Sequence, residues 1–288
     1  MVLCGTLVLV SCGTADNGII SSRHVAVAAP ATASSSEEEV MIEKLKASAF
    51  RLDQKGVNDA YSSAGEMHEL RVMQYLDDPE RPGIHPDQEG VNEAYHSAVR
   101  MNQFGHLPYN EAYDSAAKMN QLRIMQYLDD PARPGIHPDQ EGVNKAYHCA
   151  AVRDLVHVMQ YLDDPERLGI HPNQEGINHA YAERTFGADG DFANALHILQ
   201  YMDNPARAFH PDQETINDSF KSATFYEQLR VMQYLDDPER LGIHPDQEGV
   251  NKAFDYALME GRQNIILFFT APERTIRPNQ LSFPLAQL

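Results

Sequence analysis

The chain has 288 residues, 42% of them hydrophobic, which is enough apolar material for a continuous core and argues against disorder over most of its length. Its net charge of −19 repels phosphate backbones and anionic lipids, so nucleic acid is excluded as a favoured partner and neutral or basic protein surfaces are preferred. The three cysteines, Cys4, Cys12 and Cys149, are an odd number and imply no disulfide framework.

The chain begins with a short apolar segment. Within it, Leu9-Val10-Ser11-Cys12 resembles the lipobox of bacterial lipoproteins. That resemblance implies lipidation of Cys12 and export to the cell envelope or beyond, with a cytoplasmic location as the alternative. We therefore expect a signal segment over residues 1–12 and a flexible linker, rich in Ala, Ser and Thr, over residues 13–37. No apolar stretch reaches the ~18 residues of a membrane-spanning helix.

The remainder of the chain repeats one unit of 34 residues. Most copies contain a close variant of Gly-Val-Asn-x-Ala-Tyr-x-x-Ala, and we use its Asn as the marker of each unit. Successive markers are separated by 34, 18, 34, 34, 39 and 34 residues. The markers are Asn58, Asn92, Asn110, Asn144, Asn178, Asn217 and Asn251.

Each unit is predicted to contain two helices. Residues 57–64 place apolar side chains at i, i+3, i+4 and i+7, as on one face of a helix. Residues 70–76 give a second apolar helical face, which ends before Pro79 because the residue preceding a proline disfavours the α conformation. A loop rich in Gly and Pro follows. One such unit cannot bury its own apolar faces, so we expect an elongated all-α solenoid over residues 38–288.

The unequal marker spacings and the two ends of the array lead to separate structural predictions. The spacing of 18 predicts that the unit at Asn92 has lost its second helix and loop, so that the stack is disturbed near residues 104–108. The spacing of 39 predicts an enlarged turn over residues 184–191. Residues 40–45 and 265–269 are predicted to be capping helices at the two ends. Any departure from uniform partner recognition is expected at the two internal irregularities.

The order of the motifs suggests a family. Gly90-Val91-Asn92-Glu93-Ala94-Tyr95, then residues 122–128, then Gly135 resemble the ankyrin repeat, with Asn92 in the place of that family's helix-starting Thr. Thr-Pro-Leu-His is absent, so the resemblance is to a divergent member. It implies a stack whose first helices and loops line a concave partner-binding face. The alternative is another two-helix solenoid, of the tetratricopeptide or HEAT kind.

Binding residues are expected where the copies differ. The residues one and four positions after the marker vary, whereas the Ala, Tyr and Leu positions barely change, and a separation of three places both on one helix face. The candidate protein-binding residues are these positions together with Phe186 in the enlarged turn: Asp59, Glu93, His96, Glu111, Asp114, Lys145, His148, His179, Phe186, Asp218, Lys221, Lys252 and Asp255.

No catalytic motif, cofactor or metal site is expected. His residues recur in the His-Pro loops, but neighbouring loops of a solenoid lie ~10 Å apart, too far to share one ion. A hydrogen bond from each His to nearby backbone explains the repetition. These loop residues are His85, His137, His171, His210 and His244.

The sequence therefore predicts a non-catalytic scaffold for protein-protein interaction, either an exported bacterial effector or an envelope adaptor, with a host or other protein as its partner. One alternative is a structural lipoprotein spacer anchored through Cys12. The other is an enzyme with its site at residues 184–191.

Overall fold

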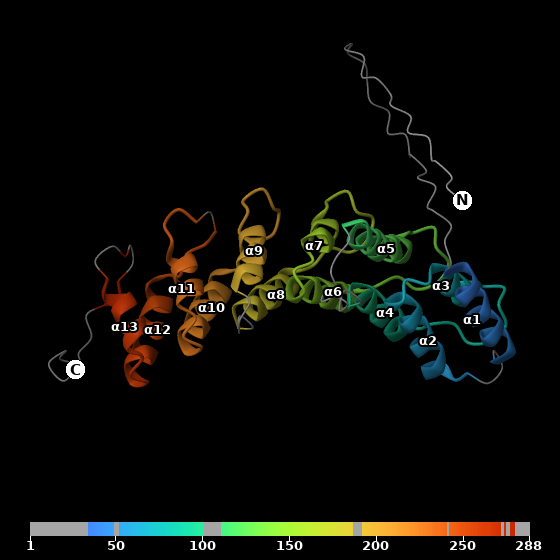
Figure 1. Cartoon of the computed structure of the whole chain (residues 1–288), viewed down its shortest axis with the longest axis horizontal. Coiled ribbons are helices and arrows are strands. Elements are labelled where there is room, and N and C mark those ends of the chain that lie inside the picture. The colour runs from blue at the N-terminus through green and yellow to red at the C-terminus, as the bar shows by residue number, and fades with distance from the viewer. Residues whose placement is uncertain are drawn as a thin grey trace, which may run out of the picture.

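The computed structural model describes residues 34–48, 52–100, 111–186, 192–240, 242–271, 274 and 277–279. Within these ranges the regular secondary structure consists of thirteen α-helices and no strand (Figure 1). The helices are α1 (Ser34–Ser48), α2 (Gln54–Glu66), α3 (Leu70–Asp77), α4 (Gln88–Arg100), α5 (Glu111–Asp129), α6 (Gln140–Val152), α7 (Val156–Asp163), α8 (Gln174–Phe186), α9 (Phe192–Met202), α10 (Gln213–Phe225), α11 (Leu229–Asp236), α12 (Gln247–Met259) and α13 (Gln263–Thr270).

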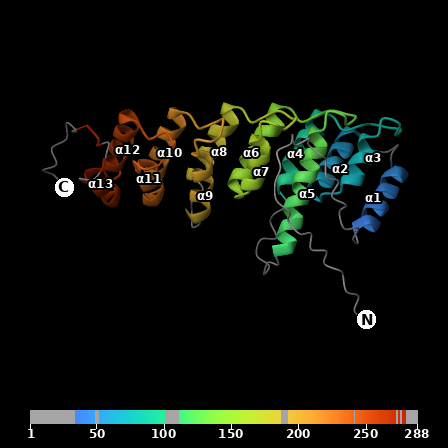
Figure 2. The ribbon, with the colours of Figure 1, turned by 90° about the horizontal axis from the view of Figure 1, so that it is seen from above.

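The helices form two rows along the length of the molecule. The first helices of the units, α2, α4, α6, α8, α10 and α12, pack against one another in order, and each second helix (α3, α5, α7, α9, α11 or α13) packs on the first helix of its own unit. Figure 1 shows the rows bent into an arch with the first helices on its inner side, and Figure 2 shows both rows from above. The predicted all-α solenoid is confirmed.

The helical periodicity of the sequence matches the buried faces. In the first unit Val57, Tyr61 and Ala64 of α2 are buried, as are Met73 and Leu76 of α3. The equivalent side chains of the other units join them in one apolar cluster that runs through the array. Burial of this kind contributes roughly 25 cal/mol per Å² of apolar surface, and it requires neighbouring units to be present.

The marker asparagine joins one unit to the next rather than starting its helix. In α6 the N-cap is Asp139, whose side chain accepts hydrogen bonds from the backbone N–H groups of Glu141 and Gly142. Asn92, in the second turn of α4, donates to the Asp139 carboxylate at 2.9 Å and accepts from its backbone N–H at 3.1 Å. An added Cβ on Gly142 would lie 2.5 Å from the Asn92 amide oxygen, which explains the glycine two residues before the marker.

The unit at Asn92 has not lost its second helix, so that prediction is wrong. Helix α4 packs directly against α6, and α5 serves as the second helix of the α4 unit. Tyr95 donates to Asp129 across 34 residues, whereas the equivalent Tyr61 and Asp77 of the first unit are 16 residues apart. The difference of 18 residues is therefore an insertion between the two helices of one unit.

Part of this insertion is helical. Residues 111–118, which repeat a first-helix pattern, form the beginning of the 19-residue α5 and lead directly into its second-helix sequence. Asn110 and residues 104–108, where a disturbed stack was predicted, lie outside the described residues. The row of first helices continues from α4 to α6 without an intervening helix.

The other irregularities follow the sequence more closely. Helix α8 ends at Phe186 and α9 begins at Phe192, so the first three residues of the predicted enlarged turn, 184–186, are helical, and residues 187–191 lie outside the described residues. Helix α1 packs on α3 in the row of second helices, and α13 packs on α12 at the other end. Because α1 begins at Ser34, the last four residues of the predicted linker are helical. Residues 1–33, including Cys12, lie outside the described residues.

A buried polar layer connects each second helix to the following unit. Asp129, at the end of α5, accepts hydrogen bonds from Arg167 at 2.7 Å, from Tyr95 at 2.9 Å and from Tyr161 at 2.7 Å. Arg167 and Tyr161 belong to the next unit, and the Arg167 and Asp129 side chains are only 1% and 5% exposed. Similar layers contain the pairs Asp77–Arg133, Asp163–Arg207 and Asp203–Arg240.

The last layer is modified at the C-terminal end. Arg274 pairs with Asp236 at 2.8 Å, but Phe220 and Phe268 occupy the two tyrosine positions. The Arg274 guanidinium lies 4.4 Å from the centre of the Phe268 ring, so the cation–π contact of the other layers is kept while the hydrogen bond to the aspartate is lost. In α13, Thr270 replaces the aspartate that would accept a further arginine. The α13 unit therefore offers no carboxylate at this position.

The layer predicts a large loss of stability when one charge is removed. Arg167→Ala leaves the Asp129 carboxylate buried without its counter-charge, so we expect the free energy of unfolding to fall by about 3–5 kcal/mol. Urea unfolding followed by circular dichroism measures it. The exposed neighbour Glu166 provides the matched control, and Glu166→Ala should change the free energy by less than ~0.5 kcal/mol. Equal effects of the two substitutions would contradict the burial of this pair.

The helix caps predict a component of stability that depends on acid pH. A hydrogen bond from the Gly249 backbone, helped by the Asn217 side chain, lowers the pKa of Asp246. Since an unfolded Asp titrates near about 3.9, this contribution is complete above that pH and is lost as the pH falls through the lower pKa of the folded chain. Asp246→Asn removes the titration but keeps a cap, as Asn173 does naturally in its own unit.

Urea unfolding at several pH values between neutral and about 2.5 compares the two proteins. The stability advantage of the natural chain over Asp246→Asn should shrink as the pH falls. An advantage that stays constant, or that grows, would show that the Asp246 carboxylate is not stabilised by the fold.

Candidate functional site

The variable positions lie on one face of the stacked first helices. Residues one, four, five and eight positions after each marker follow the i, i+3, i+4, i+7 spacing of a single helix face. We call this surface the binding face and define it by these four positions in α2, α4, α6, α8, α10 and α12. The first two positions are those that the variation between copies predicted, and the helical geometry adds the other two.

Ten of the thirteen predicted binding residues are on this face with described side chains. Those that are exposed are Asp59, Lys145, His179, Asp218, Lys221, Lys252 and Asp255. Glu93, His96 and His148 are partly buried between neighbouring helices. The exposure of the first seven residues fits the variation between copies, because a solvated position tolerates many side chains.

The other three predicted residues either lie outside this face or have no described side chain. Glu111 and Asp114 lie in α5, which belongs to the row of second helices, so their assignment to a first-helix face was wrong. Both residues were placed on a first helix because the 18-residue insertion was interpreted as a separate unit beginning at Asn110. Phe186 is the last residue of α8, eight positions after Asn178, and its side chain lies outside the described part of the structure.

The charges of the binding face are of both signs. Lys145 pairs with Glu141 at 2.7 Å, and Lys252 pairs with Glu248 at 2.7 Å, each one helical turn away on the same helix. These exposed pairs contribute little to stability, typically ~0.3–0.5 kcal/mol each. The face therefore carries both acidic and basic side chains, although the chain as a whole is strongly acidic.

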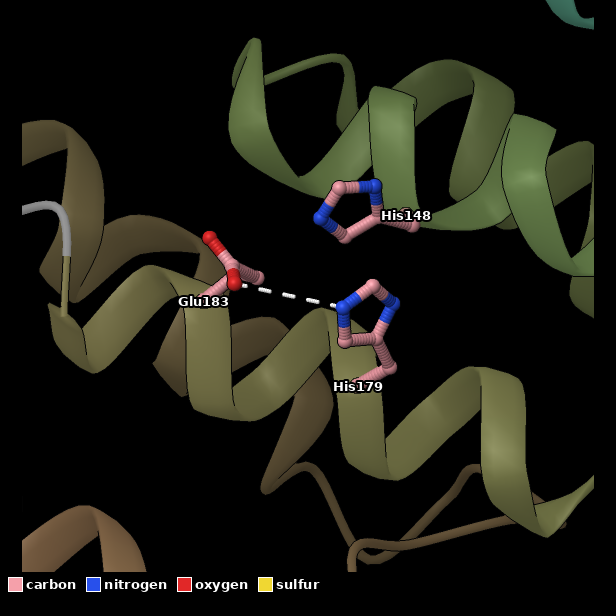
Figure 3. A group of neighbouring side chains, drawn as sticks. All are labelled: His148, His179 and Glu183. Carbon is pink, nitrogen blue, oxygen red and sulfur yellow. Dashed lines mark ion pairs between the residues drawn. The ribbon is translucent and has the colours of Figure 1, made fainter.

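Three side chains on adjacent helices come together in the middle of the binding face. His148 of α6 stacks on His179 of α8, with ring centres 4.3 Å apart and planes 15° from parallel (Figure 3). Glu183 lies one turn after His179, and its carboxylate oxygen is 3.9 Å from Nε2 of that ring. One potential ligand atom from each residue lies within 4.8 Å of the other two. Within the described chain, this is the one group of three or more His, Cys, Asp or Glu side chains so close together.

A third histidine extends this cluster toward the N-terminal end. His96 of α4 occupies the same position in its unit as His148 does in α6, and these two helices are direct neighbours. Burial lowers the pKa of His148, and the neighbouring His179 lowers it further. Burial also lowers the pKa of His96. Both imidazoles are therefore neutral at neutral pH, the form in which a ring nitrogen can act as a metal ligand.

Two members of the cluster, His148 and His179, were predicted as binding residues from the sequence, whereas Glu183 was not. The copies place Ser63 and Cys149 at the position equivalent to Glu183, and small residues there gave no sign of a functional position. The i, i+4 spacing of His179 and Glu183 was the available signal. That His96 and His148 lie on adjacent helices could not be inferred while Asn110 was counted as a separate unit.

The C-terminal part of the binding face carries aromatic and apolar side chains. Phe225, the last residue of α10, contacts the rings of Tyr226 and Tyr256 with centres 4.8 and 5.4 Å away. Phe225 and Tyr226 are each 49% exposed, and Met259 at the equivalent end of α12 is 84% exposed. Exposed aromatic side chains of this kind are typical energetic anchors of protein interfaces.

The repeated loop histidines have a structural role. In four of the five loops Nδ1 of the His lies within hydrogen-bond distance of a carbonyl at the end of the preceding second helix, as at 3.2 Å between His85 and Leu76. The His85 carbonyl in turn accepts a hydrogen bond from Gln54 of the unit before, at 2.9 Å. The predicted backbone hydrogen bonds are confirmed for His85, His137, His171 and His210.

Comparison with known proteins finds neither a family model nor a curated protein that matches this sequence. Among the helices that the structure describes, none is long and apolar enough to cross a membrane.

Proposed function

We propose that this protein is a non-catalytic scaffold that binds a partner protein along the first-helix face of the arch. The observation that carries the proposal is the contrast between the inside and the outside of each unit. Residues such as Tyr61, Tyr95 and Tyr147 recur at one buried position, whereas the exposed position one residue after the marker carries acidic, basic and imidazole side chains in turn.

The shape and chemistry of the face support this proposal. The first helices line the inner side of the arch, so a partner seated there touches several units at once (Figure 1). Side chains of both charge signs give orientation and specificity more than raw affinity. The exposed Phe225 and Tyr226 supply the large apolar contacts on which interface energy concentrates.

Family and location belong to the proposal as well. The helix-turn-helix-loop order and the stacking of first helices on first helices support a divergent ankyrin-like repeat. Export and lipid attachment at Cys12 rest on the sequence resemblance alone. An anchored array could still present the binding face to a partner, so the scaffold proposal does not depend on the anchor.

Site-specific photo-cross-linking of the full chain in its native cells tests the binding face. A photo-reactive amino acid at Lys221 or at Asp255 lies on the face, and the same residue at Gln160 or Gln233 lies on an exposed part of the second helices. All four positions are solvated, so the fold should tolerate each substitution. We expect one and the same protein to be cross-linked from Lys221 and Asp255, and not from Gln160 or Gln233.

An affinity measurement then follows with the captured partner. The exchange Asp218→Lys with Lys221→Glu keeps the net charge but inverts the local pattern, and it should weaken binding about tenfold, which equals ~1.4 kcal/mol. Cross-linking of the partner from the second helices alone, or equally from both rows, would contradict the proposal.

A further inference from the structure

We propose that His148, His179 and Glu183 form a binding site for a divalent transition-metal ion, with Zn²⁺ as the representative ion, between α6 and α8. This inference concerns the array itself and does not depend on the identity of a partner protein. It starts from the observation that two adjacent helices direct three metal-ligand side chains to one place on the binding face (Figure 3).

The donor set determines the class of ion. Two imidazole nitrogens and one carboxylate oxygen are borderline ligands, which suit Zn²⁺, Co²⁺ and Ni²⁺. Mg²⁺ and Ca²⁺ prefer sites composed of oxygen ligands, so they are not expected here. His179 and Glu183 are separated by four residues on one helix, the spacing with which two side chains of an α-helix can grip one ion.

The present geometry is close to that of a bound site. Ligand atoms on a tetrahedral zinc lie roughly 3.3 Å apart when the bonds are about 2.0–2.1 Å long. Here the Glu183 oxygen and the His179 nitrogen are 3.9 Å apart, and all three ligand atoms lie within 4.8 Å of one another. Movements of about 1 Å close the difference.

The exposed side chains can make those movements. The His179 and Glu183 side chains are 60% and 45% exposed, so they can change rotamer at little cost. Parallel stacked rings do not point their lone pairs at one ion, so His179 must turn about its side-chain bonds when the metal binds. Figure 3 shows a nitrogen of each ring on the side of the Glu183 carboxylate.

His148 provides the more rigid half of the site. Its ring is partly buried, and its Nε2 atom is buried without a hydrogen-bond partner. A buried polar atom of this kind is unusual, because such atoms nearly always find a partner. A metal ion would satisfy this nitrogen.

Two consequences follow from the position of the site. Three protein ligands leave at least one coordination position open to water or to a side chain of a partner. The ion also links α6 to α8, and therefore two consecutive units, so binding should stabilise the folded array. The second consequence is specific to a site shared between units.

Calorimetric titration of the full chain with ZnCl₂ at neutral pH tests the proposal, and the visible absorption of Co²⁺ reports the coordination. We expect one Zn²⁺ ion per chain to bind more tightly than any further Zn²⁺, and the melting temperature of the protein to rise when it binds. Mg²⁺ should produce neither effect. His179→Ala and Glu183→Gln should each weaken binding by about 100-fold or more, since loss of an outer-sphere partner alone costs ~10- to 100-fold.

A matched control comes from a second His–carboxylate pair. His197 of α9 lies 3.0 Å from Asp154 and is 60% exposed, like His179, but it has no third ligand of this kind beside it. His197→Ala should bind Zn²⁺ as the natural chain does. Absence of stoichiometric Zn²⁺ binding would overturn the proposal, as would unchanged affinity in His179→Ala and Glu183→Gln. Both variants alter exposed side chains, so loss of folding does not confuse the result.

Discussion

Asp129 is buried at the end of one unit, and the positive charge that balances it belongs to the next unit. A buried carboxylate without such a partner would cost several kcal/mol, so a unit of this array is stable only when its neighbour is in place. Tyr95 and Tyr161 fill the remaining hydrogen-bonding positions of the carboxylate. The layer therefore fixes both the order and the register of the units, which apolar burial alone would leave less sharply defined.

The copies can differ only at residues that do not join one unit to the next. The second helices and loops hold the polar layers, and the Asn–Asp contacts of the first helices hold the adjacent N-caps, as between Asn92 and Asp139. The solvent-exposed face of the first helices takes part in none of these contacts. On that face Lys145, His179 and Asp218 occupy equivalent positions of different units. A scaffold of constant interior can thus change its surface unit by unit without loss of stability, and the histidine cluster of α6 and α8 is one product of that freedom.

Much of the fold could be predicted from the sequence, because periodicity reports burial directly: Val57, Tyr61 and Met73 were placed correctly by spacing alone. The insertion could not, because residues 110–121 copy a first-helix motif, and only the packing of α4 on α6 shows that this copy is not part of the row of first helices. The Asp–Arg layers were not predicted, because acidic and basic residues beside a proline are also typical of an exposed helix end. Glu183 was missed because its significance arises from a neighbour one helical turn away and a ring on another helix.

The units on either side of the insertion meet through the same contacts as the other internal units. Deletion of residues 102–119 tests this, because Met101 would then precede Asn120-Gln121-Leu122 with the spacing of Met67-His68-Glu69-Leu70 in the first unit. Urea unfolding of the shortened chain should stay cooperative, with a free energy within ~1 kcal/mol of the full chain, since shortening a connection changes loop entropy only slightly. Loss of cooperative unfolding, or a fall of several kcal/mol, would show that the deleted residues are part of the stack.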